Sequence, residues 1–323
     1  MRSKRHLILY IAVAVAAAAL VACGAQGRVS KGVQPKVEQS TTVVADYLLN
    51  VAFKVKRASQ MLDAEAQRAY YAEHFWDEFD FADSTFVAQV DNTLMIHTLL
   101  TAVTLSSTPE TAPDYLTKLM RQTVVSKPVM QYFLTMGEEL FYDPNSPLRN
   151  DELYIPILRV ALDSGLLDEY ERLPYESDLH IASQNRGGRV ANEFYLTLAS
   201  GKRISLYDVE ADYVLLFISN PGCPMCRDVK EAILASQLLS DMVEDESLKI
   251  VVLYPDADLD AWHAAKGDYP EEWINGYDAE QTIEANDLYD LKAIPSLYLL
   301  DADKRALVKD SVSVPYIEES ILY

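Results

Sequence analysis

Apolar residues in the first half of the chain recur at the spacing of amphipathic helices. From about residue 41 to 175 they stand three or four positions apart, which places them on one face of a helix. Val44, Leu48, Val51 and Val55 keep this spacing. We therefore predict an all-helical domain over residues 41–175, with its first helix over this group of four.

Other features of this half predict where helices begin and end. The stretch from Ala112 to Leu140 is apolar at helical intervals and carries few helix breakers. Residues 143–147, Asp-Pro-Asn-Ser-Pro, have the composition of a turn. Asn150 then stands where a helix N-cap would, followed by two acidic residues that the helix dipole favours in a first turn.

The pattern changes to short strands after periodicity lapses over residues 177–188. Arg-Gly-Gly-Arg at 186–189 predicts a linker. Residues 194–198 and 204–206 flank a turn at 200–202, which predicts a β-hairpin.

Two continuous apolar runs, at 213–218 and 249–254, are typical of strands buried on both faces of a sheet. The helix predicted between them, from Cys223 to about Leu239, makes a parallel crossover unit. Two short strands between residues 296 and 308 predict a final antiparallel pair. The expected fold class is α+β overall, with the all-helical domain followed by an α/β domain that has a central mixed sheet.

The chain is acidic, with 28 Lys and Arg against 49 Asp and Glu and a formal net charge of −21. Such a chain repels phosphate backbones, which argues against a nucleic acid as partner. It has 3 cysteines, too few for a scaffold held together by disulfides.

The first residues have the character of a secretory signal. A basic start is followed by an apolar run over residues 7–20, shorter than the about 20 apolar residues of a membrane-spanning helix. The run ends in Leu-Val-Ala-Cys at 20–23, which resembles the lipobox of bacterial lipoproteins. This resemblance implies a signal peptide over residues 1–22 and lipidation of Cys23. An ordinary secreted protein with a chance cysteine at this place is the alternative.

Residues 23–40 are polar and lack periodicity, so we expect a flexible tether that keeps the protein close to its membrane. Gly24 stands where enteric-type lipoproteins that stay in the inner membrane carry an aspartate. By that resemblance the protein is expected in the cell envelope, anchored by lipid in the outer membrane and facing the periplasm.

Residues 74–81, His-Phe-Trp-Asp-Glu-Phe-Asp-Phe, raise the question of a metal site because a histidine stands among carboxylates. No second histidine or cysteine stands at ligand spacing. We therefore expect aromatic side chains that pack against a helix end, solvated carboxylates between them, and no metal.

The strongest chemical signal is Cys223-Pro224-Met225-Cys226, placed between an apolar strand and a helix. A thiol at the start of a helix meets unpaired backbone N–H groups and the positive end of the helix dipole, and both favour the thiolate. A second thiol one turn later can displace whatever the first has captured. The pair therefore has the spacing that thiol–disulfide exchange requires.

These elements, together with Ala293-Ile294-Pro295-Ser296 ahead of a further strand, resemble the thioredoxin fold. The resemblance covers residues 188–323. Within that fold the chain is most similar to the secreted, membrane-tethered branch related to cytochrome-maturation and sporulation thiol–disulfide proteins, above all over residues 289–301.

The resemblance implies roles for four residues. Cys223 would be the attacking thiolate, and Cys226 would resolve the mixed disulfide. Pro295 would be cis and face the cysteines, exposing the Ile294 backbone to a bound substrate strand. The only redox group would be the Cys223–Cys226 disulfide, without a further cofactor. Partners would be protein thiols or disulfides and a thiol electron donor or acceptor in the envelope, with the direction of transfer left open.

The helical part also resembles a family. Residues 75–77 and 142–150 are similar to a helical domain of unknown function that precedes thioredoxin-like domains in Gram-negative lipoproteins. This second resemblance implies no activity.

Three positions near the cysteines depart from the family pattern. Phe217 stands where many thioredoxins bury an aspartate, and Val229 stands where many members of the tethered branch carry a glutamate. Gly222 takes the place of a tryptophan that often precedes the first cysteine. Exchange is therefore expected to be slow, and the competing hypothesis is a non-catalytic thioredoxin-like binding module.

Two further interpretations of the cysteine pair were weighed against exchange. A purely structural disulfide would close so small a loop that it would remove little entropy from the unfolded chain. A zinc site needs four ligands, and only His180 and His263 accompany the two cysteines in this half.

Overall fold

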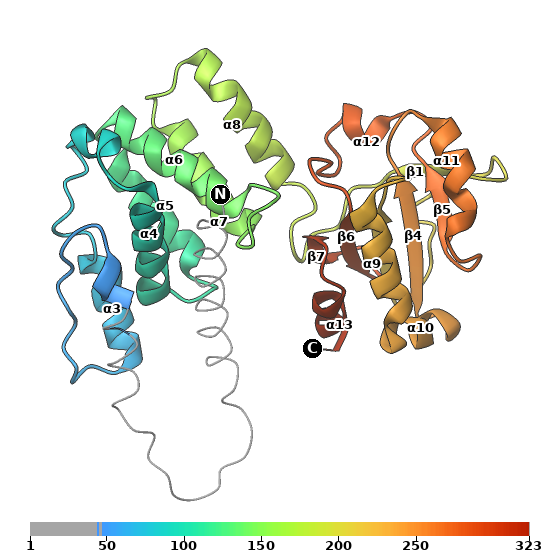
Figure 1. The fold of residues 1–323 in the computed structure, drawn as a ribbon, viewed down its shortest axis with the longest axis horizontal. Coiled ribbons are helices and arrows are strands. Elements are labelled where there is room, and N and C mark those ends of the chain that lie inside the picture. The colour runs from blue at the N-terminus through green and yellow to red at the C-terminus, as the bar shows by residue number, and fades with distance from the viewer. Residues whose placement is uncertain (1–43, 45–46, 323) are drawn as a thin grey trace, which may run out of the picture. The chain divides into compact units, whose positions relative to one another are not determined.

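The computed structural model describes Val44 and residues 47–322. The chain divides between Glu176 and Ser177 into two compact units (Figure 1). The predicted signal peptide, the lipidation of Cys23 and the tether up to residue 40 lie outside the described residues. Within the described part of the chain, no helix is both long enough and apolar enough to cross a membrane.

The described residues of the N-terminal unit form helices and connecting loops without a strand, as the apolar spacing predicted. The last of its helices, α8, runs across the boundary into the second unit. The elements are η1 (Leu48–Asn50), α3 (Ala64–His74), η2 (Ser84–Ala88), α4 (Asn92–Ser106), α5 (Ala112–Thr123), α6 (Lys127–Phe141), α7 (Asp151–Asp163) and α8 (Glu169–Ala182).

Local signals in this unit were interpreted correctly. Asn150 is the N-cap of α7, and its side chain accepts a hydrogen bond from the backbone N–H of Glu152 at 3.0 Å. The turn ahead of it closes through a bond from the Ser146 N–H to the Asp143 carbonyl at 2.9 Å. The predicted stretch 112–140 is two helices, and Pro128 lies in the first turn of the second, where a missing N–H costs nothing.

The helix expected over Val44 to Val55 was wrong beyond Asn50. From Val51 the chain is irregular, because side chains of neighbouring helices take up its backbone donors. The N–H of Ala52 donates to Thr98 Oγ1 at 2.8 Å, and the N–H of Ala58 donates to the Tyr71 hydroxyl at 3.2 Å. These tertiary bonds replace the ones that a helix would have made within itself.

The helical structure does not end where periodicity lapses at Ser177, contrary to the predicted boundary. Helix α8 continues to Ala182, which is its only buried residue. An exposed helix needs no apolar stripe, so apolar spacing cannot reveal it. Polar contacts support it instead. Asp168 accepts from two backbone N–H groups of the first turn, Arg172 pairs with Glu176 at 2.8 Å, and Glu171 pairs with Lys127 of α6 at 2.7 Å.

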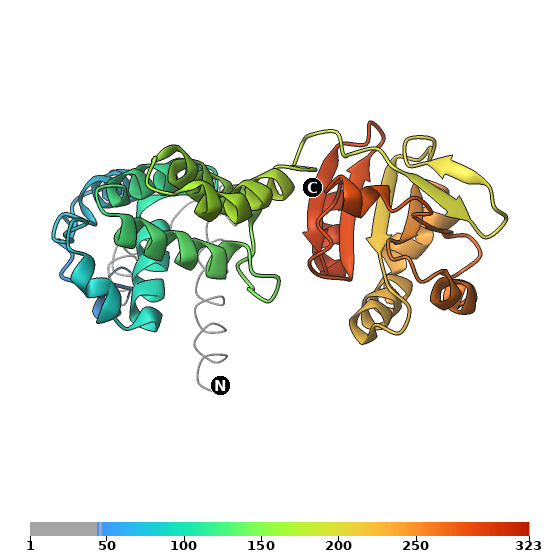
Figure 2. The ribbon, with the colours of Figure 1, turned by 90° about the horizontal axis from the view of Figure 1, so that it is seen from above.

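The C-terminal unit is built around one seven-stranded sheet with the strand order β2-β1-β5-β4-β3-β6-β7. Figure 2 shows the yellow β1–β2 hairpin at one side of this sheet and the red strands β6 and β7 at the other. The elements are β1 (Tyr195–Leu198), β2 (Arg203–Ser205), β3 (Tyr213–Ile218), α9 (Pro224–Ala235), α10 (Gln237–Glu244), β4 (Leu248–Tyr254), α11 (Leu259–Ala265), η3 (Lys266–Asp268), β5 (Ile274–Tyr277), α12 (Thr282–Ala285), β6 (Ser296–Asp301), β7 (Ala306–Ser311) and α13 (Val314–Leu322).

The predicted strand pairings are confirmed. Strands β1 and β2 form an antiparallel hairpin, β3 and β4 are parallel, and β6 and β7 are antiparallel. Strand β5 was not predicted; it pairs parallel to β4 and antiparallel to β1, and so joins the hairpin to the centre of the sheet. The result is the predicted α+β class with a mixed sheet.

The alternation of side chains along β3 separates two apolar clusters. Leu215 and Phe217 face the layer of α9, α10 and α13, where they meet Cys226. Leu216 lies on the opposite face with Ile283 of α12. Figure 1 shows α9 lying across the sheet with α10 at its end. The cysteine pair therefore belongs to the α9 side of the sheet.

The single helix predicted from Cys223 to about Leu239 was wrong, because it is broken at Ser236. This residue has the extended values φ −75° and ψ 113°, so α9 ends and α10 begins on either side of it. Its hydroxyl accepts from the Leu239 N–H at 3.1 Å and donates to Glu318 of α13. A serine that bonds to the next turn restarts a helix in a new direction.

Candidate functional site

Cys223 lies at the junction between β3 and α9 and is the N-cap of the helix. Its sulfur accepts a hydrogen bond from the backbone N–H of Cys226 at 3.2 Å. Gly222 has φ +74°, a left-handed conformation that lets the chain turn sharply into the helix. A tryptophan at position 222 would be strained in this backbone, so the departure from the family pattern has a local cause.

Cys226 lies one turn further along α9 and points into the apolar cluster beside β3. Its side chain is 3% exposed and packs with Phe217 and Val229. Burial, the largest effect, and the neighbouring Cys223 together raise the pKa of the Cys226 thiol to about 11, against a smaller lowering by the Asn220 backbone and the Ser219 hydroxyl. Both cysteines are free thiols, one partly exposed and one buried.

The loop that precedes β6 lies directly against the first cysteine. The Ile294–Pro295 peptide bond is cis, as predicted. The thiol of Cys223 contacts the Ile294 carbonyl oxygen at 3.7 Å, within reach of a weak S–H···O hydrogen bond. The structure thus brings together all four residues that the resemblance singled out, whereas a role of Ile294 and Pro295 in holding substrate stays a prediction.

The two positions at which the family often carries an acid are apolar and buried. Phe217 is 0% exposed and Val229 is 6% exposed. Within the described part of the chain, no carboxylate acts on the Cys226 thiol. The nearby Asp228 is exposed and pairs with Arg227 at 3.4 Å. Proton removal from Cys226 therefore cannot follow the family route.

A pair of hydroxyl groups that the sequence did not reveal lies beside this thiol. Ser219, the residue after β3, is 2% exposed, and its Oγ is 2.7 Å from the hydroxyl oxygen of Tyr269. The Tyr269 ring meets Phe217 edge to face, with centroids 6.3 Å apart. No sequence signal marks Tyr269, because it stands in the connection between η3 and β5, far along the chain from both cysteines.

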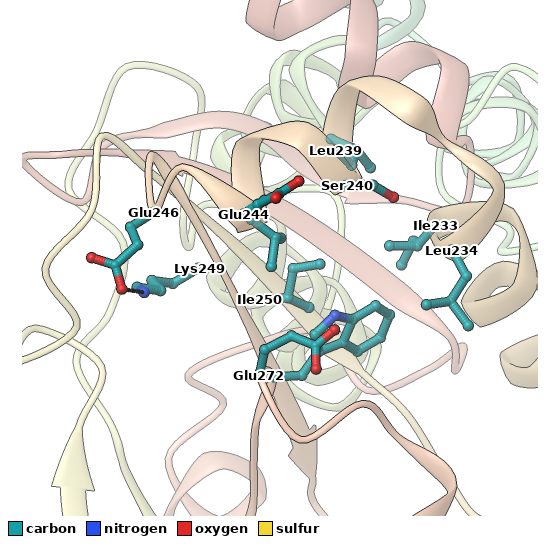
Figure 3. A pocket seen from close by; sticks show the side chains of 11 residues that line it. Ile233, Leu234, Leu239, Ser240, Glu244, Glu246, Lys249, Ile250 and Glu272 are labelled. Carbon is teal, nitrogen blue, oxygen red and sulfur yellow. Dashed lines mark hydrogen bonds and ion pairs between the residues drawn. The ribbon is translucent and has the colours of Figure 1, made fainter.

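A pocket of about 650 Å³ lies near the other end of α9 and is separate from the thiol pair. Figure 3 shows Ile250 of β4 at its centre, Ile233 and Leu234 of α9 on one side, and the pair of Glu246 and Lys249, 3.4 Å apart, on the other. It is lined by Ile233, Leu234, Leu239, Ser240, Val243, Glu244, Glu246, Lys249, Ile250, Glu272 and Trp273. No cysteine is among these residues.

The stretch 74–81 of the N-terminal unit forms an aromatic cluster, as expected. The ring of Trp76 lies 5.4 Å from Phe79, 5.8 Å from Phe81 and 5.7 Å from Phe133, measured between centroids. His74 Nδ1 lies 3.1 Å from a carboxylate oxygen of Asp77. In the described residues, no group of three histidine, cysteine or acidic side chains is arranged to hold a metal ion.

Known proteins or protein families are similar to both parts of the chain. The family model described as a domain of unknown function, DUF5106, matches residues 22–185. A thioredoxin-like protein from Bacteroides caccae superimposes with a TM-score of 0.78 at 36% identity, over 84% of this chain and 98% of that protein. No curated protein matches.

Two solved structures from Bacteroides fragilis are also similar. The C-terminal domain of an uncharacterized protein is 42% identical over 43% of this chain and 99% of its own, with a TM-score of 0.42. A conserved protein of unknown function is 29% identical over 42% of this chain and 98% of its own, with a TM-score of 0.41.

The match to DUF5106 agrees with the predicted resemblance of the helical part to a domain of unknown function. The sheet order, the helix that starts after Cys223 and the cis proline loop agree with the predicted thioredoxin-like fold. The chain therefore belongs to the DUF5106 family and to the thioredoxin-like proteins that the Bacteroides caccae structure represents.

Proposed function

We propose that the protein is a thiol–disulfide oxidoreductase that exchanges disulfides with other proteins through Cys223 and Cys226. The observation that carries this proposal is the placement of the two thiols at the start of α9. Cys223 is partly exposed at the start of the helix and accepts a hydrogen bond from the Cys226 N–H at 3.2 Å, and Cys226 lies one turn further along. The adjoining Met225 is 57% exposed and offers an apolar contact for a partner.

The two thiols supply both electrons of the proposed reaction. The Cys223 thiolate attacks one sulfur of a substrate disulfide, whose S–S bond breaks, and the departing substrate sulfur takes up a proton. Cys226 then loses its proton and attacks the Cys223 sulfur, which forms the Cys223–Cys226 disulfide and releases the second substrate thiol. Two electrons pass from the protein to the substrate.

No cofactor is needed beyond this disulfide. To act again as a reductant, the protein must receive two electrons from a thiol donor in the same compartment. With an acceptor instead of a donor, the same steps run in reverse and oxidise substrate thiols. The reduction potentials of the partners set the direction.

The proposal includes a lipid anchor at Cys23 and a place in the cell envelope, at the outer membrane facing the periplasm. Its support is the basic and apolar start of the chain and the Leu-Val-Ala-Cys sequence at 20–23. Labelling of cells with a radioactive fatty acid tests it. The full-length chain should take up label and sediment with outer membranes, whereas Cys23→Ser should do neither.

The catalytic proposal is tested with a chain that lacks residues 1–23. We expect it to accelerate the reduction of insulin by dithiothreitol. Cys223→Ser should abolish this acceleration, and Cys226→Ala should accumulate mixed disulfides that gel electrophoresis without reductant detects. Turnover that persists in Cys223→Ser would exclude Cys223 as the nucleophile.

A non-catalytic binding module is the second candidate, favoured by the apolar side chains of Phe217 and Val229 and by the raised pKa of Cys226. A redox titration separates the two functions. A pair that equilibrates with a glutathione or dithiothreitol buffer supports exchange. A pair that stays oxidised in strong thiol buffer, in a protein without reductase activity, supports the binding module.

A further inference from the structure

The resolving step of the proposed exchange has a requirement that the usual family acids do not meet in this chain. Cys226 must give up its proton before it can attack the Cys223 sulfur. Its thiol is buried, and burial raises its pKa to about 11. Phe217 and Val229 occupy the positions of the family acids, so another group must accept the proton.

Two hydroxyl groups lie where such an acceptor is needed. Ser219 lies close enough to the Cys226 thiol to lower its pKa, and the Ser219 Oγ is 2.7 Å from the Tyr269 hydroxyl oxygen. Tyr269 packs against the apolar cluster that contains Cys226. Ser219 is buried, whereas Tyr269 is only partly buried. The Cys226 thiol, the Ser219 hydroxyl and the Tyr269 hydroxyl therefore lie in that order from the buried sulfur towards the surface.

The surroundings of Tyr269 hold its ring in place and leave its hydroxyl neutral. Lys230 of α9 lies 5.5 Å from the ring centroid and donates to the Asp268 carbonyl at 3.1 Å, which ties the loop to the helix. Burial raises the pKa of Tyr269, the hydrogen bond with Ser219 lowers it, and the electrostatic effect of Cys226, Asp268 and Cys223 raises it. A neutral hydroxyl can accept one proton while it donates another.

We propose that Ser219 and Tyr269 form the path by which the Cys226 proton leaves during the resolving step. The Cys226 S–H bond breaks as Ser219 Oγ takes the proton, the Ser219 proton passes to the Tyr269 oxygen, and the Tyr269 proton passes to water. The Cys226 sulfur, now a thiolate, attacks Cys223, and no oxidant or reductant beyond the mixed disulfide takes part. This inference rests on the proposed function, because it concerns the second step of the same exchange.

The test separates the two steps of exchange in a single mixing experiment. The reduced chain without residues 1–23, whose cysteines are Cys223 and Cys226 alone, is mixed with an equimolar amount of dithiobis(nitrobenzoate), a disulfide that releases one coloured thiolate at each step. The first release reports attack by Cys223, and the second reports resolution by Cys226. If the unaltered chain gives neither release, the proposed function fails, and with it the relay.

Tyr269→Phe should leave the rate of the first release unchanged and slow the second about 100-fold at neutral pH, within the range for a positioned acid–base group. In this variant the second rate should also rise about tenfold per pH unit below the thiol pKa, because attack then depends on free thiolate. The unaltered chain should show a weaker rise. A second release with unchanged rate and pH profile in Tyr269→Phe would overturn the proposal.

Two further variants distinguish a relay from a packing effect. Ser219→Ala should slow the second release to the same extent, and the double variant should be no slower, because both hydroxyls belong to one path. Additive slowing would indicate separate structural effects and contradict the relay. The control is Tyr254→Phe, which removes a hydroxyl bonded to the Asp258 carbonyl at 3.0 Å and should leave both releases unchanged.

Discussion

Each unit contains a hydrogen bond of a tyrosine hydroxyl beside aromatic rings. In the N-terminal unit, Trp76 Nε1 donates to the Tyr115 hydroxyl at 2.9 Å. In the C-terminal unit, the Ser219 and Tyr269 hydroxyls are 2.7 Å apart. The two bonds differ in what surrounds them.

The bond between Trp76 and Tyr115 is enclosed on all sides. Both side chains are buried, and burial raises the pKa of Tyr115 to about 12, so its proton stays in place over the whole working range of pH. The described neighbours of Trp76 are the rings of Phe53, Phe75 and others of the cluster, without a thiol. This bond stabilises the fold and does no chemistry.

The bond between Ser219 and Tyr269 has a titratable thiol on one side and partial exposure on the other. If the proposed relay is right, the comparison teaches that a buried hydrogen bond takes part in chemistry when a proton can enter it at one end and leave at the other. The following predictions test that distinction, beginning with the largest effect.

Trp76→Ala should lower the free energy of unfolding of the N-terminal unit by about 3–5 kcal/mol, the range for removing a buried large aromatic side chain. The loss combines apolar burial, ring contacts and the bond to Tyr115. Denaturation followed by far-ultraviolet circular dichroism measures it. The first thiolate release, which depends on Cys223, should persist and would show that the C-terminal unit is folded. A loss below about 1 kcal/mol would mean that the cluster does not carry the stability of this unit.

Tyr115→Phe should lower the free energy of unfolding of the N-terminal unit by about 2 kcal/mol, because the indole N–H of Trp76 is left buried without an acceptor. Both thiolate releases should keep their rates and pH profiles. This outcome would be the opposite of the one expected for Tyr269→Phe, in which rate changes more than stability. Equal effects of the two substitutions on the second release would remove the distinction between a structural hydrogen bond and one that takes part in the reaction.

Cys226→Ala should make the free energy of unfolding less dependent on pH, by about 1 kcal/mol over the alkaline range. The folded-state pKa of this thiol, about 11, lies above the value of 9.0 that an exposed thiol has. Its contribution to stability is therefore complete below about pH 9 and is lost as the pH rises towards 11. Between about pH 8 and 10 the unaltered chain should lose about 1 kcal/mol more than the variant, as denaturant midpoints at the two pH values measure. Equal losses would mean that the thiol is not shielded from water as the structure shows.

Much of the fold was predictable because its signals are local. The apolar runs at 213–218 and 249–254 became β3 and β4, and the Asn150 cap began α7. The failures share a different cause. The segment after Asn50 and the break at Ser236 depend on bonds to Thr98 and Glu318, which lie elsewhere in the chain.

The sequence by itself determined the cysteine pair at a helix start, the apolar strands β3 and β4 and the proline just ahead of β6. Each of these depends on residues that are neighbours in the chain, where spacing and propensity act directly. Only the tertiary structure decided which groups surround the buried sulfur. Tyr269 reaches Ser219 across 50 positions because the connection from η3 to β5 folds back over β3, and no local pattern encodes that meeting. Proton transfer requires contact between atoms, and such contacts are fixed by packing rather than by position in the sequence.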